Sequence, residues 1–130
     1  MVMVDRIEWY GQDKRVVLQT YEDRTTWESF LDIATQSATM LNSVDYPVQV
    51  IVNRTNAFYP KFQPTKMRII GDMVPINQDL VVVVGAEYSV ETLSKVIGSR
   101  VASRAFDGTF YVGTIEHAHD ILKRERNIEL

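Results

Sequence analysis

The chain has 130 residues, of which 45% are hydrophobic, and it carries 14 basic against 17 acidic side chains for a formal net charge of −3. This length fits one folded domain over residues 1–130, and the apolar content excludes a disordered chain. The absence of cysteine excludes disulfides, thiolate metal sites and cysteine nucleophiles. The weakly acidic charge balance excludes the basic surface that nucleic-acid binding requires, so no nucleic-acid partner is expected.

The N-terminus carries no predicted targeting segment. The apolar residues 1–4 are too few for the core of a signal peptide, and no apolar stretch of the chain is long enough to span a membrane. A chain without cysteine also suits a reducing compartment. We therefore expect a soluble, cytoplasmic protein with no membrane insertion.

The first third of the chain predicts a β-hairpin followed by an amphipathic helix. Apolar alternation over residues 7–10 and a β-rich run over 15–21 flank a turn at 11–14. Thr25, with Glu28 three residues later, fits a capping box that begins a helix. The apolar stripe of this helix has spacings of three and four, through Trp27, Phe30, Leu31, Ala34, Ala38, Leu41 and Val44. Pro47 ends it.

The rest of the chain alternates between buried strands and helices. Continuous apolar runs at 48–52 and 80–84 predict strands covered on both faces, and Thr109 to Val112 predicts a last strand. Three helices are predicted, one opened by Pro64, one capped by Ser89 and one capped by Thr114. Their apolar faces hold, respectively, Met67, Ile70, Met73 and Val74; Val90, Leu93, Val96, Ile97 and Val101; and Ile115, Ala118, Ile121 and Leu122.

The element order is therefore β-β-α-β-α-β-α-β-α. Strands separated by helices of this length pair in parallel, and the hairpin adds an antiparallel edge. We expect an α/β fold: one mixed, mostly parallel sheet of about five strands, flanked by about four helices.

Ligands of open α/β sheets bind beyond the carboxyl ends of the strands, which here are followed by segments 53–61, 85–89 and 113–116. We interpret the first segment as a loop that offers hydrogen-bond donors, positive charge and aromatic faces together. Its candidate binding residues are Asn53, Arg54, Thr55, Tyr59 and Lys61. Such a set suits an anion or an acidic group of a partner. The alternative is an ordinary polar loop whose aromatic residues cover the core.

The second segment joins a buried strand to a helix, so its backbone amides are placed to bind a phosphate. Its candidate residues are Glu87, Tyr88 and Ser89. It lacks the glycine patterns of nucleotide-binding loops, and the carboxylate of Glu87 repels phosphate. The alternative is a plain turn in which Ser89 caps the helix.

The remaining polar side chains predict structural or solvated roles. His117 and His119 are two residues apart on one helix, so they point to different faces and do not predict a metal site. We interpret Asp5, Glu8, Asp13, Glu22 and Asp23 as solvated charges along the hairpin, which deter sheet-to-sheet aggregation. The basic residues Lys123, Arg124 and Arg126 complement the dipole at a helix end. Trp9 and Trp27 are expected in the core.

The element order and five short segments resemble the SpoIIAA-like (STAS-like) family of small bacterial α/β domains. The segments are residues 14–18, 26–30, 47–52, 81–85 and 114–118. The resemblance covers nearly the whole chain and implies a compact β-α domain. In the family's anti-sigma-factor antagonists, a serine that begins the second crossover helix is phosphorylated. The Asp-Ser-Ser-Gly of that site is absent here, and the nearest phosphoacceptor is Thr65. Asn53 stands where an aspartate often ends the central strand.

Three functional hypotheses follow. The first is a non-enzymatic binding or regulatory domain that recognises a protein partner or a small ligand, anionic or lipidic, at the strand-end loops without a cofactor. The second is a small enzyme that acts on an anionic metabolite, with Arg54 and Lys61 as a clamp and Tyr59 or His117 as the acid. The third is a phosphoswitch at Thr65. A homodimer that covers an edge strand is compatible with each.

Overall fold

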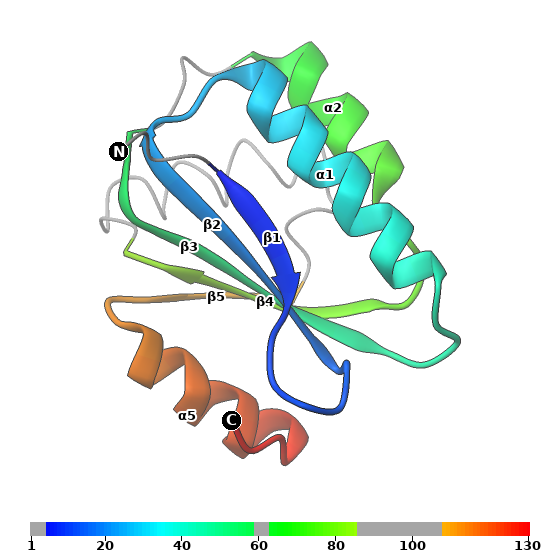
Figure 1. Cartoon of the computed structure of the whole chain (residues 1–130), viewed down its shortest axis with the longest axis vertical. Coiled ribbons are helices and arrows are strands. Elements are labelled where there is room, and N and C mark those ends of the chain that lie inside the picture. Colours follow the sequence, from blue (N-terminus) through cyan, green and yellow to red (C-terminus); the bar gives the residue numbers. More distant parts are fainter. Residues whose placement is uncertain (1–4, 59–62, 86–107) are drawn as a thin grey trace.

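The computed structural model describes residues 5–58, 63–85 and 108–130, which form one β-sheet with helices on both of its faces (Figure 1). The strands are β1 (Arg6–Trp9), β2 (Val16–Arg24), β3 (Val48–Phe58), β4 (Gln78–Val84) and β5 (Thr109–Val112). The helices in these ranges are α1 (Trp27–Asn42), α2 (Pro64–Met73) and α5 (Ile115–Arg126). The predicted helix capped by Ser89 lies outside the described residues.

The strands lie in chain order across the sheet, β1-β2-β3-β4-β5. β1 pairs antiparallel with β2, and the three following pairs are parallel. The predicted mixed, mostly parallel sheet of five strands is therefore confirmed. All four parallel strands end at the same edge, which we call the carboxyl edge; the opposite one is the amino edge.

Different helices cover the two faces of the sheet. In Figure 1, α1 and α2 lie on one side and α5 lies on the other. The core under α1 contains Val17, Leu41, Val48, Val50 and Val81. The core under α5 contains Val16, Leu18, Ile51, Val82, Val84, Val112, Ala118, Ile121, Leu122 and Ile128. Because side chains alternate along a strand, consecutive valines of β2 and β4 supply opposite faces. Each fully buried valine or leucine stabilises the fold by roughly 1.5–3 kcal/mol.

The start of α1 differs from the prediction by one residue. Thr26 is the N-cap, and its Oγ1 accepts a hydrogen bond from the Ser29 backbone N–H at 3.1 Å. The predicted capping box of Thr25 with Glu28 is therefore wrong. Because β2 continues to Arg24, Thr25 lies directly beyond the sheet, where it is only 5% exposed.

β3 is also longer than predicted. The chain stays in the sheet through Phe58, because β2 extends to Arg24 and pairs with it there. The interpretation of Asn53 onward as a loop is therefore wrong for residues 53–58. The polar residues of this stretch are poor strand formers, and pairing with the long β2 overrides that preference.

The two other predicted helices that lie in the described ranges agree with the structure. α2 begins at Pro64 and buries Met67 and Ile70, which pack with Trp27 of α1 in a third cluster. Thr114 caps α5, and Ala118, Ile121 and Leu122 are buried as predicted. In the described ranges, no helix combines the length and the apolar character needed to cross a membrane.

Candidate functional site at the carboxyl edge of the sheet

A β-bulge shapes β3 at the carboxyl edge. Between Asn53 and Asn56, β3 advances three positions while β2 advances two, from Thr20 to Glu22. Bulges of this kind re-aim side chains and occur frequently beside binding sites. The Asn53 Oδ1 atom accepts hydrogen bonds from the Thr55 backbone N–H (3.1 Å) and hydroxyl (2.7 Å), which holds the bulge in shape.

Gly85, at the end of β4, fits closely against this bulge. A Cβ atom on Gly85 would lie 2.7 Å from the Thr55 Cα, and the glycine has a φ of +87° that other residues rarely adopt. The backbones of β3 and β4 therefore approach each other here as only glycine permits. Of the predicted binding residues in this segment, Asn53 is half-buried and Thr55 is exposed at the rim.

Arg54 is buried on the α1 side of the sheet. Its side chain is 4% exposed, and its guanidinium carbon lies 5.5 Å from the ring centroid of Tyr21 and 6.0 Å from that of Phe30. The two rings stack at 5.2 Å. Burial raises the pKa of the Tyr21 phenol, the positive charge of Arg54 opposes that rise, and Asp5 adds to it. Tyr21 is therefore a neutral donor, and it donates to Gln19 Oε1 at 2.9 Å.

Asp5 connects three elements at this edge. Its Oδ1 accepts a hydrogen bond from the Glu22 backbone N–H at 2.7 Å, and its Oδ2 accepts one from the Ser29 hydroxyl at 2.6 Å. These contacts tie the start of β1 to the end of β2 and the first turn of α1. Both carboxylate oxygens of Asp5 are engaged, so Asp5 fixes the edge in place.

Glu22 has an unused buried oxygen at this edge. It is 7% exposed; its Oε1 contacts Arg6 Nη1 at 3.2 Å, whereas its Oε2 is buried and has no hydrogen-bond partner among the described residues. The buried Thr25 Oγ1 also has none in these ranges. A buried acceptor without a donor costs about 1–3 kcal/mol, more if it is charged. Such a group calls for an explanation, and a bound donor is one.

The interpretation of the hairpin carboxylates as solvated charges is therefore wrong for Asp5 and Glu22. The sequence does contain a signal for Glu22, because it continues the even-numbered series Val16, Leu18 and Thr20 of β2, all buried. That series becomes visible only if the strand is extended beyond Tyr21.

Other predicted residues are not brought to this cluster. Tyr59, Lys61, Glu87, Tyr88 and Ser89 lie outside the described residues. Thr65 is exposed in the first turn of α2.

The two histidines lie on α5, on the face of the sheet opposite Arg54, so the structure does not bring His117 and Arg54 together. His117 is exposed as expected. His119, contrary to the expectation, is half-buried, and its Nε2 forms a hydrogen bond of 2.8 Å with the Tyr10 hydroxyl.

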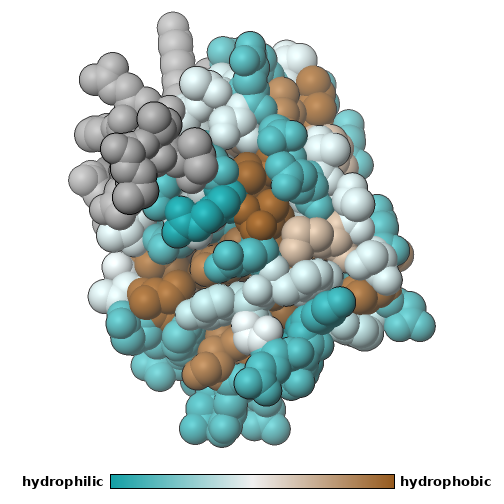
Figure 2. Space-filling view, viewed as in Figure 1, coloured by the Kyte–Doolittle hydropathy of each residue, from teal (hydrophilic) through white to brown (hydrophobic). Residues whose placement is uncertain are grey.

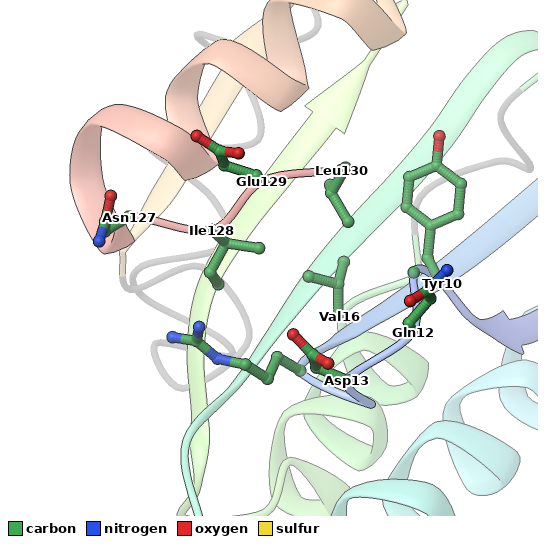
Figure 3. Close-up of a pocket in the computed structure, with 10 residues that line it drawn as sticks. Tyr10, Gln12, Asp13, Val16, Asn127, Ile128, Glu129 and Leu130 are labelled. Carbon is green, nitrogen blue, oxygen red and sulfur yellow. The ribbon is translucent and has the colours of Figure 1, made fainter.

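A shallow groove of about 220 Å³ lies at the amino edge, between the hairpin turn and the segment that follows α5 (Figure 3). Ile128 and Leu130 lie along one side of it, and Tyr10, Gln12 and Asp13 line the other. Among the described side chains that line this groove, no polar atom is both buried and without a hydrogen-bond partner. This distinguishes the groove from the carboxyl edge.

The amino edge is held by matched polar contacts. Gln49 accepts from the Leu80 backbone N–H at 2.9 Å and donates to Asp79 Oδ2 at 3.1 Å, and Arg126 binds both oxygens of Asp79 at 2.6 and 3.0 Å. Hydrogen bonding from Arg126, which outweighs the opposing effect of burial, and from Gln49 lowers the pKa of the Asp79 carboxyl. Asn77 Nδ2 donates to the carbonyl of Leu41, in the last turn of α1, and to that of Tyr46, beyond the helix.

No protein-family model and no curated protein matches this chain. The function is therefore inferred from the side chains of the carboxyl edge.

Proposed function

We propose that this protein is a non-enzymatic binding or regulatory domain of the STAS-like kind, which recognises a small ligand or a protein partner at the carboxyl edge of its sheet. The observation that carries the proposal is the buried carboxylate of Glu22, held by Arg6 through one oxygen and open for a donor at the other. Asp5 supports this arrangement by binding the Glu22 backbone. The site lies where open α/β sheets bind their ligands.

The chemistry of the edge favours recognition of a polar molecule. Glu22 Oε2 accepts a hydrogen bond from an amine, amide or hydroxyl group, and hydrogen bonds to an ionised acceptor are among the stronger ones in proteins. Asn53 and Thr55 shape the adjacent rim through the β3 bulge.

Native mass spectrometry of gently purified protein tests this proposal. We expect a bound mass that disappears on denaturation, and we expect Glu22→Gln to reduce its occupancy at least about tenfold, as loss of a charged acceptor predicts. Asp13→Asn removes an exposed carboxylate of the same hairpin, at its turn, and serves as the control. Undiminished occupancy in Glu22→Gln would place the ligand elsewhere. An apo mass in every sample contradicts a retained small ligand, and affinity capture with wild type and Glu22→Gln then tests the partner form.

A second candidate function is a phosphoswitch at Thr65. This residue is exposed at the second position of α2, and Gln63 provides no side-chain hydrogen bond as N-cap. A phosphate there would lie near the positive end of the helix dipole and its unpaired backbone amides. Co-expression with candidate kinases should add the mass of one phosphate to the wild type and none to Thr65→Ala. Equal mass gain in both variants excludes Thr65 as the acceptor.

The enzyme hypothesis remains a prediction, and fewer described residues support it. Its clamp and acid residues are Arg54, Lys61, Tyr59 and His117, of which only Arg54 and His117 lie in the described ranges, on opposite faces of the sheet. A turnover screen with pooled phosphorylated and carboxylated metabolites tests it, and activity that survives substitution of all four residues contradicts these assignments.

A further inference from the structure

β1 is the edge strand of the sheet, and its outer side carries no strand among the described residues. The backbone N–H and C=O groups of its even-numbered residues point toward β2. The hydrogen bond from the Tyr10 N–H to the Val16 carbonyl, at 2.7 Å, fixes this alternation. In an antiparallel ladder, inward and outward backbone groups alternate. The N–H and C=O groups of Ile7 and Trp9 therefore point away from the sheet, where they can pair with another strand.

The side chains of β1 form a regular pattern. Arg6 and Glu8 are exposed on one face of the strand, and Ile7 and Trp9 are half-buried on the other, at the rim of the core under α1. Figure 2 shows apolar surface among polar side chains on the face of the molecule where β1 lies in Figure 1. Edge strands are usually protected by charges that repel a second strand. Here the two charges of the strand have opposite signs.

We propose that β1 pairs antiparallel with β1 of a second copy, about a two-fold axis that passes through Ile7. In this register Ile7 faces Ile7 of the other copy in a hydrogen-bonded pair, which matches the outward direction of its backbone groups. Arg6 then faces Glu8 of the other copy, twice by symmetry. Opposite charges that face each other directly across two strands stabilise their pairing.

The neighbouring registers are disfavoured by charge. An axis through Arg6 places two arginines face to face, and an axis through Glu8 places two glutamates face to face, and like charges at directly opposed positions destabilise a sheet. The internal contact of Arg6 Nη1 with Glu22 leaves other guanidinium donors for Glu8 of the second copy. Charge complementarity thus favours the axis through Ile7, which joins the two five-stranded sheets into one.

The oligomeric state of the full chain, measured by sedimentation equilibrium across a range of concentrations, tests the proposal. We expect a reversible dimer in the wild type. Glu8→Lys, which faces Arg6 of the other copy, should weaken the dimer at least about tenfold. Asp120→Lys makes the same charge change on the exposed side of α5 and should have no effect. A wild type that stays monomeric, or a dimer that Glu8→Lys leaves unchanged, overturns the proposal.

The register has its own test, because the chain contains no cysteine. Cα atoms of a hydrogen-bonded antiparallel pair lie about 5.5 Å apart, within the span of a disulfide. Ile7→Cys should therefore form a covalent dimer on mild oxidation, and Glu8→Cys should do so far more slowly. The reverse order of rates, or no cross-linking of either variant, contradicts an axis through Ile7. Circular dichroism confirms that both variants are folded, and Glu8 is an exposed position.

Discussion

Both ends of the parallel strands carry a β-bulge, and the two bulges are held in different ways. At the amino edge, β4 carries an extra residue between Gln78 and Val81, and the side chains of Gln49 and Arg126 satisfy the groups around it. At the carboxyl edge, the bulge in β3 rests on Gly85, and the neighbouring Glu22 keeps an acceptor to which no described residue donates.

This difference separates a structural end from a candidate binding end. Gln49, Asp79, Asn77 and Arg126 at the amino edge find their polar partners within the chain, so they contribute to folding, whereas Thr109 Oγ1 at the start of β5 is buried without a hydrogen-bond partner among the described residues. The carboxyl edge keeps an unused charged acceptor, that of Glu22, which is typical of a surface that binds something else. Substitution of Gln49 at one edge and of Glu22 at the other should therefore have opposite consequences for stability and binding.

The largest effect is expected at the close approach of β3 and β4. Gly85→Ala introduces a Cβ atom 2.7 Å from the Thr55 Cα at a φ of +87°. Backbone strain and overpacking together should lower the free energy of unfolding by about 2–4 kcal/mol. Gly113→Ala is the control, because nothing lies within 4 Å of its added Cβ. Urea denaturation measures both, and equal losses in the two variants would show that the contact does not restrict the edge.

The amino edge should be the next most sensitive. Gln49→Leu keeps a buried side chain of similar size but leaves the Leu80 N–H without its acceptor. We expect a loss of about 1–3 kcal/mol in the free energy of unfolding, the usual cost of an unsatisfied buried group. Binding at the carboxyl edge should be unchanged in the folded variant. A Gln49→Leu protein with wild-type stability would contradict the structural role of this edge.

Glu22 should behave in the opposite way. Glu22→Gln removes a buried charge whose one ion-pair partner among the described residues, Arg6, is largely exposed. We expect the free energy of unfolding to rise by about 0.5–1 kcal/mol while ligand or partner binding falls. Chemical denaturation and native mass spectrometry on the same preparations measure the two quantities. A loss of stability above about 1 kcal/mol would show that Glu22 serves the fold and not binding.

The smallest expected effect is a pH dependence at the amino edge. Arg126 lowers the pKa of Asp79 in the folded state, so the stabilisation is present above the ordinary aspartate pKa and disappears as the pH falls through the lowered value. The stability difference between wild type and Asp79→Asn should therefore shrink as the pH falls below the ordinary aspartate pKa. Because solvent screens the partly exposed Arg126, we expect this to be the smallest of the four effects. Asp120→Asn should show no such trend. If the stability difference between wild type and Asp79→Asn is constant with pH, the ion pair of Asp79 with Arg126 does not stabilise the fold.

The order of elements was predictable because each described element has a strong local signal. The valine-rich segment that became β4, the Pro64 start of α2 and the Thr114 cap of α5 all have the expected structure. Local periodicity does not carry strand order, since it says which residues are buried and not which strand lies beside which.

The candidate site was harder to predict, and Glu22 shows why. Its burial depends on β2 continuing past Tyr21, and that continuation depends on pairing with the polar end of β3, where Glu22 lies beside Asn56, 34 residues later in the chain. Asn53 and Thr55 were recognised as polar residues at a strand end, but their bulge exists only in the paired sheet. Non-local pairing thus created the features that sequence periodicity could not indicate.

The sequential strand order has a consequence for how the protein is made. Each strand of the sheet lies next to the one synthesised before it, so the sheet can grow in one direction as the chain leaves the ribosome, without waiting for distant segments. Among the described helices, α5 alone covers the second face, where Leu18, Ile51 and Val82 are buried. Because α5 is also the last described element to be synthesised, its docking buries apolar surface that would otherwise promote aggregation of the nascent sheet.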